Sequence, residues 1–203
     1  MQTPKEGKVT FDSEGTEGGF FHSRKLHVPT SSSGLTLGRG YDMRFKSSLK
    51  IKNDLIKANI ARNEAELISQ ANSLVGQRAK DFIKKNKLEK FEITPNVQLK
   101  LFEITYKEEE SETKRLCTKS DVEAKYGKCD WTKLNPAIKE ILVDLKFRGD
   151  YHSEARKTIQ KIVSENNVED FLKKISDKAI WKNVPQDRFG RRVKYFKENY
   201  KSK

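Results

Sequence analysis

The glycines are distributed unevenly, and this distribution most constrains what the chain can fold into. Seven of the eleven glycines lie in the first forty residues, together with Pro29 and the run TSSS. Glycine supplies the positive φ angles that tight turns need, so this part predicts short strands joined by turns. Strands are expected at VTFD (9–12) and LTLG (35–38), and a strand or an extended loop at FFHSRKLHVP (20–29).

From about residue 47 onward, apolar residues recur three and four residues apart, which predicts helices with one buried face. The apolar stripes are Leu67, Ile68, Ala71 and Val75; Ile138, Ile141, Leu142 and Leu145; Val168, Phe171, Leu172 and Ile175; and Phe189, Val193, Phe196 and Tyr200. The expected helix caps are Thr94 and Asn135, each before a proline, Asn63 with Glu66 as a capping box, Ser153 and Asn167. The expected helix breakers are Gly76, Gly127 and Gly149.

The turn-rich first part and the helical remainder of the sequence predict an α+β fold with two lobes. Residues 1–45 are expected to form a small N-terminal lobe of strands and loops, and residues 46–203 a large helical lobe. A length of 203 residues is enough for both lobes to share one domain. A cleft between two such lobes is the expected ligand site.

The net charge of +13 suits an anionic partner such as nucleic acid, acidic lipid or the bacterial wall. Charge alone does not choose among these partners and favours a plain, lysine-rich soluble surface. No apolar run is long enough to span a membrane, so membrane insertion is not expected. The segment MQTPKEGKVTF lacks the apolar core of a signal peptide, so the chain is expected to be cytosolic or to lack a signal or fusion part, which leaves its localisation open.

The cysteines and histidines predict neither a metal nor a cofactor. Cys117 and Cys129 form no CxxC pair, and no histidine accompanies them at the spacing of zinc ligands. The three histidines are few and scattered. The two cysteines are expected to form a disulfide in a secreted protein or to stay free thiols, and neither is expected to be catalytic.

The stretch SSSGLTLGRGYDM (31–43) raises the question of a phosphate-binding loop. Such a loop needs Lys and then Ser or Thr after its last glycine, whereas Tyr41 and Asp42 follow Gly40 here. A carboxylate at that position would repel phosphate. The glycines therefore predict a hairpin turn whose bare backbone lets a bulky polymer, such as a sugar chain, approach closely.

Glu14 stands in a second glycine cluster, FDSEGTEGG (11–19), and would complete such a site. Cleavage of a glycosidic bond needs a proton donor and a second polar group that handles the water. Glu14 is the candidate donor, and Asp42, or Thr36 holding a water, is the candidate for the opposite face of the sugar. The plainer alternative for Glu14 is a turn carboxylate that caps nearby backbone N–H groups.

Two blocks, FDSEG (11–15) and FHSRKLHVPTSSSGLTLGRGYDM (21–43), resemble the muramidase domain of pesticin-type toxins and related phage-type lysozymes. The similarity is nearly continuous from Ser33 to Asp42. NPAIKEILVDLKFRGDY (135–151) is similar to the central helix of phage-type lysozymes, and WKNVPQDRFGRRVKYFKENY (181–200) to their C-terminal block. The resemblance implies a lysozyme-like fold and antibacterial hydrolysis of the β-1,4 bond between N-acetylmuramic acid and N-acetylglucosamine in peptidoglycan.

The resemblance also implies roles for individual residues. Glu14 would be the general acid, Thr36 would position the attacking water, and Asp42 would act as base or orient that water. Phage-type lysozymes have their Asp between the Glu and the Thr, whereas here it follows the Thr, as in pesticin-type domains. Glu17 is the rival acid, but the strand expected at VTFD leads directly into Glu14 and favours it. An inverting mechanism is expected, with the Glu14 and Asp42 carboxyl groups roughly 6.5–9.5 Å apart.

Further residues are expected to contact the substrate. Gly38, Tyr41 and Phe147 are the candidate substrate-binding residues, although phage-type lysozymes have His where Tyr41 stands. Arg188 and Arg191 are the candidate cleft arginines, with surface charge on a basic helix as the alternative for both.

Two other functions remain as alternatives to a monomeric peptidoglycan hydrolase. A non-catalytic peptidoglycan-binding module would keep the fold and the charge without turnover. A nucleic-acid-binding protein would use the basic segment FGRRVKYFKENYKSK (189–203), but no recognised nucleic-acid motif supports it, so nucleic acid is not the expected partner.

Overall fold

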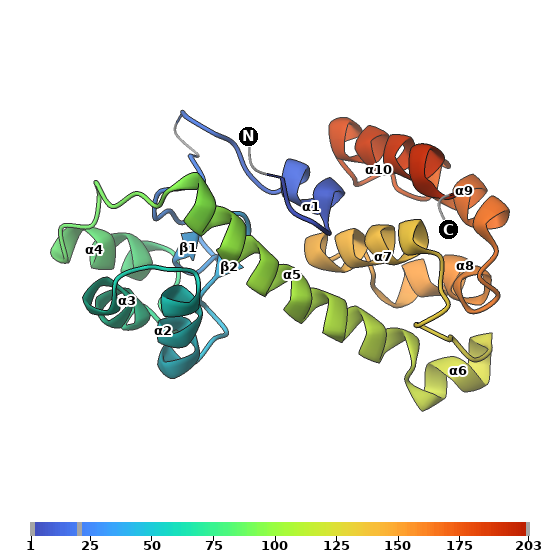
Figure 1. The fold of residues 1–203 in the computed structure, drawn as a ribbon, viewed down its shortest axis with the longest axis horizontal. Coiled ribbons are helices and arrows are strands. Elements are labelled where there is room, and N and C mark those ends of the chain that lie inside the picture. Colours follow the sequence, from blue (N-terminus) through green and yellow to red (C-terminus); the bar gives the residue numbers. More distant parts are fainter. Residues whose placement is uncertain (1–2, 20–21, 202–203) are drawn as a thin grey trace. The chain divides into compact units, whose positions relative to one another are not determined.

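The computed structural model describes residues 3–19 and 22–201, and within them the chain is rich in helix and carries one small sheet (Figure 1). The strands are β1 (Thr36–Leu37) and β2 (Tyr41–Asp42). The helices are α1 (Lys8–Ser13), α2 (Ser48–Lys57), α3 (Arg62–Ser69), α4 (Gln77–Lys85), α5 (Pro95–Cys117), α6 (Ser120–Tyr126), α7 (Pro136–Arg148), α8 (Ser153–Ser164), α9 (Val168–Ile175) and α10 (Gln186–Asn199). Helix with a small sheet agrees with the predicted α+β class.

The chain forms two compact units whose boundaries differ from the predicted lobes. The first unit contains residues 3–5 and Glu14–Thr105, and the second contains Glu6–Ser13 together with the chain from Tyr106 onward. Helix α5 therefore contributes its first part to one unit and its second part to the other. The junction expected near residue 45 lies inside the first unit.

In the first unit, β1 and β2 form an antiparallel pair, and α2, α3 and α4 gather near it (Figure 1). The turn between the strands contains Gly38 and Gly40, whose φ angles are 63° and 88°, so the predicted hairpin is confirmed. The core includes Leu35, Leu37, Tyr41, Met43, Ile51, Leu55, Ile68 and Leu101, all of which are fully buried. Isolated bridges at His22, Lys25 and His27 show an extended chain there, whereas residues 20 and 21 lie outside the described residues.

The segment VTFD is helical, so the predicted strand at 9–12 is wrong. It belongs to α1, which buries Val9 and Phe11. The cause is a contact from far along the chain: the Glu140 carboxylate of α7 accepts hydrogen bonds from the backbone N–H groups of Gly7 (3.2 Å) and Val9 (3.1 Å). The first N–H groups of a helix lack partners within the helix, and an anion there is favourable.

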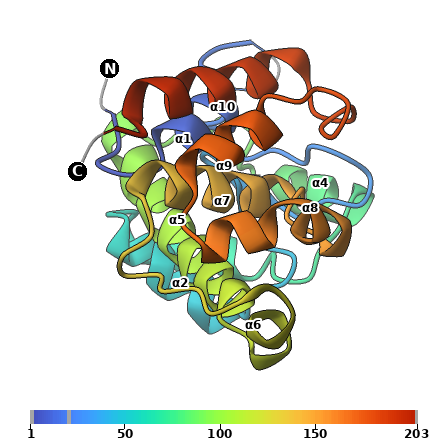
Figure 2. The same ribbon diagram turned by 90° about the vertical axis from the view of Figure 1, so that its right-hand side faces the viewer.

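Helix α7 lies at the centre of the second unit. Its predicted stripe of Ile138, Ile141, Leu142 and Leu145 is buried. Helices α1 and α10 pack against α7, and α9 packs against α8 and α10 (Figure 2).

The predicted helix boundaries are partly correct. The capping side chains of Thr94, Asn135 and Asn167 accept hydrogen bonds from Val97, Ala137 and Asp170, which confirms them. Two caps are misplaced, because Ala61 rather than Asn63 precedes α3 and His152 rather than Ser153 caps α8. The stripe at 67–75 also runs past its helix, since α3 ends at Ser69.

Candidate functional site

The hairpin brings two of the three candidate catalytic residues together. Thr36 of β1 and Asp42 of β2 are direct partners in the antiparallel pair. Thr36 is almost completely buried, and its hydroxyl donates a hydrogen bond to the carbonyl oxygen of Gly34 at 3.2 Å. Because its proton is used in this way, the hydroxyl presents its lone pairs to any other donor.

The Asp42 carboxylate is held by the backbone on both sides. Its Oδ2 accepts from the N–H of Gly34 at 3.3 Å, and its Oδ1 accepts from the N–H of Arg44 at 2.8 Å. Glycine is the only residue type that fits at position 34, because a Cβ there would clash with Asp42 Oδ1 and would lie 2.7 Å from the Arg44 nitrogen. The glycine therefore leaves room for the half-buried Asp42 carboxylate, and the two backbone N–H groups fix its orientation.

Glu14 follows α1 directly and is half-buried. The next residue is tied to the hairpin: the Arg39 guanidinium, from the turn between β1 and β2, donates to the carbonyl oxygen of Gly15 at 3.1 Å. A Cβ on Gly15 would lie 3.0 Å from Ser23 and 3.1 Å from the Arg39 side chain. Gly15, the residue after Glu14, is thus packed closely against the side chain of Arg39, which lies in the turn between β1 and β2.

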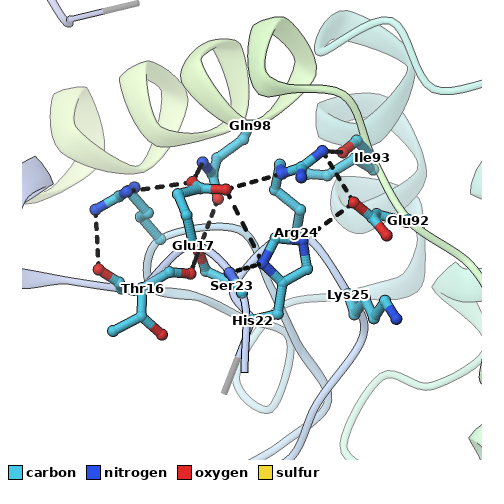
Figure 3. Close-up of polar contacts among 12 residues, drawn as sticks. Thr16, Glu17, His22, Ser23, Arg24, Lys25, Glu92, Ile93 and Gln98 are labelled. Carbon is cyan, nitrogen blue, oxygen red and sulfur yellow. Dashed lines mark hydrogen bonds and ion pairs between the residues drawn. The ribbon is translucent and has the colours of Figure 1, made fainter. Parts of the chain in front are cut away.

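Glu17, the rival acid, lies in a polar cluster that the sequence did not predict (Figure 3). Its carboxylate accepts hydrogen bonds from Arg24 (2.9 Å), Arg39 (3.3 Å) and Gln98 (2.7 Å). Partial burial by itself would raise the pKa of Glu17, but the hydrogen bonds from Gln98, Arg24 and Arg39 outweigh burial and lower that pKa. Glu17 is therefore held in its ionised form.

His22 and Glu92 extend this cluster (Figure 3). His22 Nδ1 accepts from the backbone N–H of Gly18 at 2.6 Å, while Nε2 lies 3.0 Å from a Glu92 oxygen. Because Nδ1 accepts a hydrogen bond, Nε2 is the ring nitrogen that donates to Glu92. The sequence gives one indication of this cluster, which is Arg39 between the turn glycines Gly38 and Gly40.

Tyr41 and Gly38 do not present a surface to a substrate, which corrects their predicted role. Tyr41 is fully buried, and its hydroxyl donates to Asp54 Oδ2 at 2.8 Å. The side of Gly38 where a Cβ would project faces Leu101 and Gln98 of α5. Tyr41 turns inward because it neighbours Asp42 in β2, and alternate residues of a strand face opposite sides. Gly38 lies in the turn after β1, with a φ angle of 63°.

A comparison with protein families gives one match. The sequence model of a domain of unknown function (DUF8812) matches residues 7–193. The chain belongs to the DUF8812 family. No curated protein matches the sequence.

In this DUF8812 chain, the remaining predicted site residues all lie in the second unit. Arg188 is buried and binds Asp144, with Nη2 2.6 Å from Oδ1, so it is neither a surface charge nor open to a ligand. Arg191 is exposed on α10 and donates to the backbone carbonyl of Asp12 in α1. Phe147 is half-buried near the end of α7.

The described part of the DUF8812 chain offers neither a cluster of metal ligands nor a membrane-spanning helix. Within residues 3–19 and 22–201, no group of three or more His, Cys, Asp or Glu side chains could hold a metal ion. None of the helices described there is long and apolar enough to cross a membrane.

Proposed function

We propose that this protein is a peptidoglycan hydrolase with a lysozyme-like fold, and that it cleaves the β-1,4 bond between N-acetylmuramic acid and N-acetylglucosamine. The observation that carries the proposal is the hydrogen bond from Arg39 to Gly15. It ties the residue after Glu14 to the hairpin that pairs Thr36 with Asp42. The two carboxyl groups that glycoside hydrolysis requires, and the threonine proposed to position the water, therefore come from two connected segments.

The environment of Glu17 supports the assignment of Glu14 as the acid. A general acid must carry a proton at the start of the reaction, and the lowered pKa of Glu17 is the opposite of this requirement. Glu17 therefore serves as a structural carboxylate, and Glu14 donates the proton to the glycosidic oxygen as the bond breaks.

Thr36 and Asp42 handle the water in this proposal. The Thr36 hydroxyl donates to Gly34, so it accepts a hydrogen bond from the attacking water. The Asp42 carboxylate, fixed by Gly34 and Arg44, takes the second proton of the water or orients the water for attack. An attack from the face opposite Glu14 gives inversion at the anomeric carbon.

The net charge of +13 suits an anionic bacterial wall as the partner. Steering by charge is screened by salt, so salt is expected to lower activity on whole cells more than on soluble oligomers.

The test is the release of muropeptides from purified peptidoglycan by the protein and by Glu14→Gln. The variant should lose about 10²–10⁴-fold in rate, whereas Glu89→Gln, at an exposed carboxylate of the same unit, should keep full activity. Equal rates for the protein and Glu14→Gln exclude Glu14 as the acid. Sedimentation with peptidoglycan without any release would favour the alternative, a non-catalytic binding module.

A further inference from the structure

Helix α4 and the turn that follows it carry exposed positive charges without acidic partners. The α4 basic surface consists of six exposed side chains: Arg78, Lys80, Lys84, Lys85, Lys87 and Lys90. Within residues 3–19 and 22–201, none of the six forms an ion pair with a carboxylate. The segment has two acidic residues, and one of them, Asp81, accepts a hydrogen bond from Gln77 at 2.8 Å. The positive charge of this surface is therefore largely uncompensated.

Helices α8 and α9 show the opposite arrangement. Lys157 and Lys161 of α8 pair with acidic side chains of the same helix at 2.6 and 3.4 Å. Lys173 of α9 pairs with Asp170 at 2.8 Å. Lysines of this chain are thus neutralised by neighbours on those helices, whereas the lysines of α4 are left for a partner outside the chain.

The packing of α4 directs its charges to solvent. Ala79 is buried, and Phe82 and Ile83 pack against the core of the first unit. These residues form the apolar face of the helix, so the basic side chains lie outside that face. Because the apolar side chains of α4 are used in the core, the surface lacks the apolar anchor with which an amphipathic helix enters a lipid bilayer.

Lys87 occupies a backbone position where glycine is usual. Its φ angle is 55°, and the N–H groups of Lys87 and Leu88 donate to the carbonyls of Lys84 (3.1 Å) and Ile83 (2.9 Å), which ends the helix. Glycine adopts this left-handed conformation at a helix end without steric cost. The chain therefore has a cation where the backbone alone favours glycine.

We propose that the α4 basic surface binds a polymer with repeated phosphate groups, namely the teichoic acid of a bacterial wall. Five of the six cations are lysines, which bind phosphate as separate point charges on flexible stems. Such a row suits anions that repeat along a polymer. None of the six is an aromatic residue on which the bases of single-stranded nucleic acid could stack. The choice of a wall polymer rests on the proposed hydrolase function, whereas the basic surface itself does not.

The experiment measures binding of fluorescently labelled poly(glycerol phosphate) by anisotropy, at low and at high salt. The α4 variant combines Lys84→Gln, Lys85→Gln and Lys87→Gly, and its Kd at low salt should rise by about 10–100-fold. The difference should shrink as salt screens the charges. Lys87→Gly alone should weaken binding and leave the melting temperature equal or higher, because glycine fits the left-handed position. Its weaker binding then cannot come from unfolding.

The matched control removes the same number of charges at lysines that already have acidic partners. It combines Lys157→Gln, Lys161→Gln and Lys173→Gln, and its Kd should change by less than about threefold. Equal losses for the control and the α4 variant would overturn the proposal, since net charge rather than this surface would then govern binding. Tighter binding of double-stranded DNA than of the polymer, at equal phosphate concentration and salt, would also overturn it.

A second assay separates this proposal from the hydrolase function. The protein and the α4 variant should release muropeptides at equal rates from peptidoglycan stripped of teichoic acid, because the substituted residues lie outside the proposed catalytic site. Absence of release by both would count against the hydrolase alone, since polymer binding is measured without turnover. Unchanged polymer binding by the α4 variant would overturn the α4 basic surface alone.

Discussion

Thr36 and Asp42 face each other across a non-hydrogen-bonded pair of β1 and β2. Thr36 directs its backbone N–H and carbonyl to His27 on the other side, at 2.8 and 3.0 Å. In such a pair the two side chains lie on the same face of the sheet and are closer than in the hydrogen-bonded pairs. The Thr36 hydroxyl and the Asp42 carboxylate therefore lie on one face of the sheet, as the roles proposed for them require.

The first prediction concerns the Thr36 hydroxyl. Thr36→Val keeps the shape but removes the group that accepts a hydrogen bond from water, and should lower the rate of muropeptide release by about 10–100-fold. It also leaves the Gly34 carbonyl without its side-chain donor, which should cost about 1 kcal/mol of stability. Thr36→Ser keeps the hydroxyl and should retain most activity. A Val variant as active as the Ser variant would contradict the role of Thr36.

The second prediction concerns Gly34, whose missing Cβ makes room for the Asp42 carboxylate. Gly34→Ala should displace that carboxylate and the Arg44 backbone, with a loss of about 1–3 kcal/mol of stability and a large loss of activity. Gly190→Ala is the matched control, because a Cβ there meets open space on α10. It should stabilise the helix by about 0.5–1 kcal/mol. Circular dichroism melts and activity assays of both variants provide the measurement.

The third prediction concerns Arg39, which we expect to position the chain beside Glu14. Arg39→Met should release Gly15 and lower kcat about tenfold or more with a smaller change in KM. Arg39→Lys keeps the charge but not the planar pair of donors, so it should recover only part of kcat. If Arg39→Met lowers the melting temperature but leaves kcat and its pH profile intact, Arg39 has a structural role only.

Local patterns in the sequence were sufficient for the hairpin and for α7. The glycines of the turn and the stripe at 138–145 reflect preferences of neighbouring residues, and the structure has both. The strand predicted at VTFD was wrong because the helix there depends on Glu140, which lies more than a hundred residues away in sequence. No local preference reports a contact of that kind.

The site shows the same division between local and distant causes. The pairing of Thr36 with Asp42 follows from the predicted turn, because a hairpin fixes the register of its strands. The inward direction of Tyr41 was missed, although strand alternation next to Asp42 could have indicated it. The hydrogen bonds to the Glu17 carboxylate could not be predicted, because their donors Arg24, Arg39 and Gln98 come from three separate segments.

The last prediction concerns Asp144, the buried carboxylate of the second unit. Its oxygens lie 2.6 Å from Arg188 Nη2 and 2.5 Å from Arg192 Nε. Burial alone would raise the pKa of Asp144, but Arg192 and Arg188 outweigh it, so the pKa is lowered. Asp144→Asn leaves two buried arginines without their partner and should cost about 3–5 kcal/mol at neutral pH.

The pH dependence gives this prediction a sign. A carboxyl with a lowered folded pKa contributes stability that is complete above its unfolded pKa of about 4, and that is lost as pH falls through the folded pKa. The difference in unfolding free energy between the protein and Asp144→Asn should therefore be constant from about pH 7 to 5 and shrink below about pH 4. Urea unfolding followed by the fluorescence of Trp131 and Trp181 reports on this unit. A difference that stays constant down to the most acidic pH at which the protein folds would contradict the assignment, because an ionised Asp144 is what the two arginines stabilise.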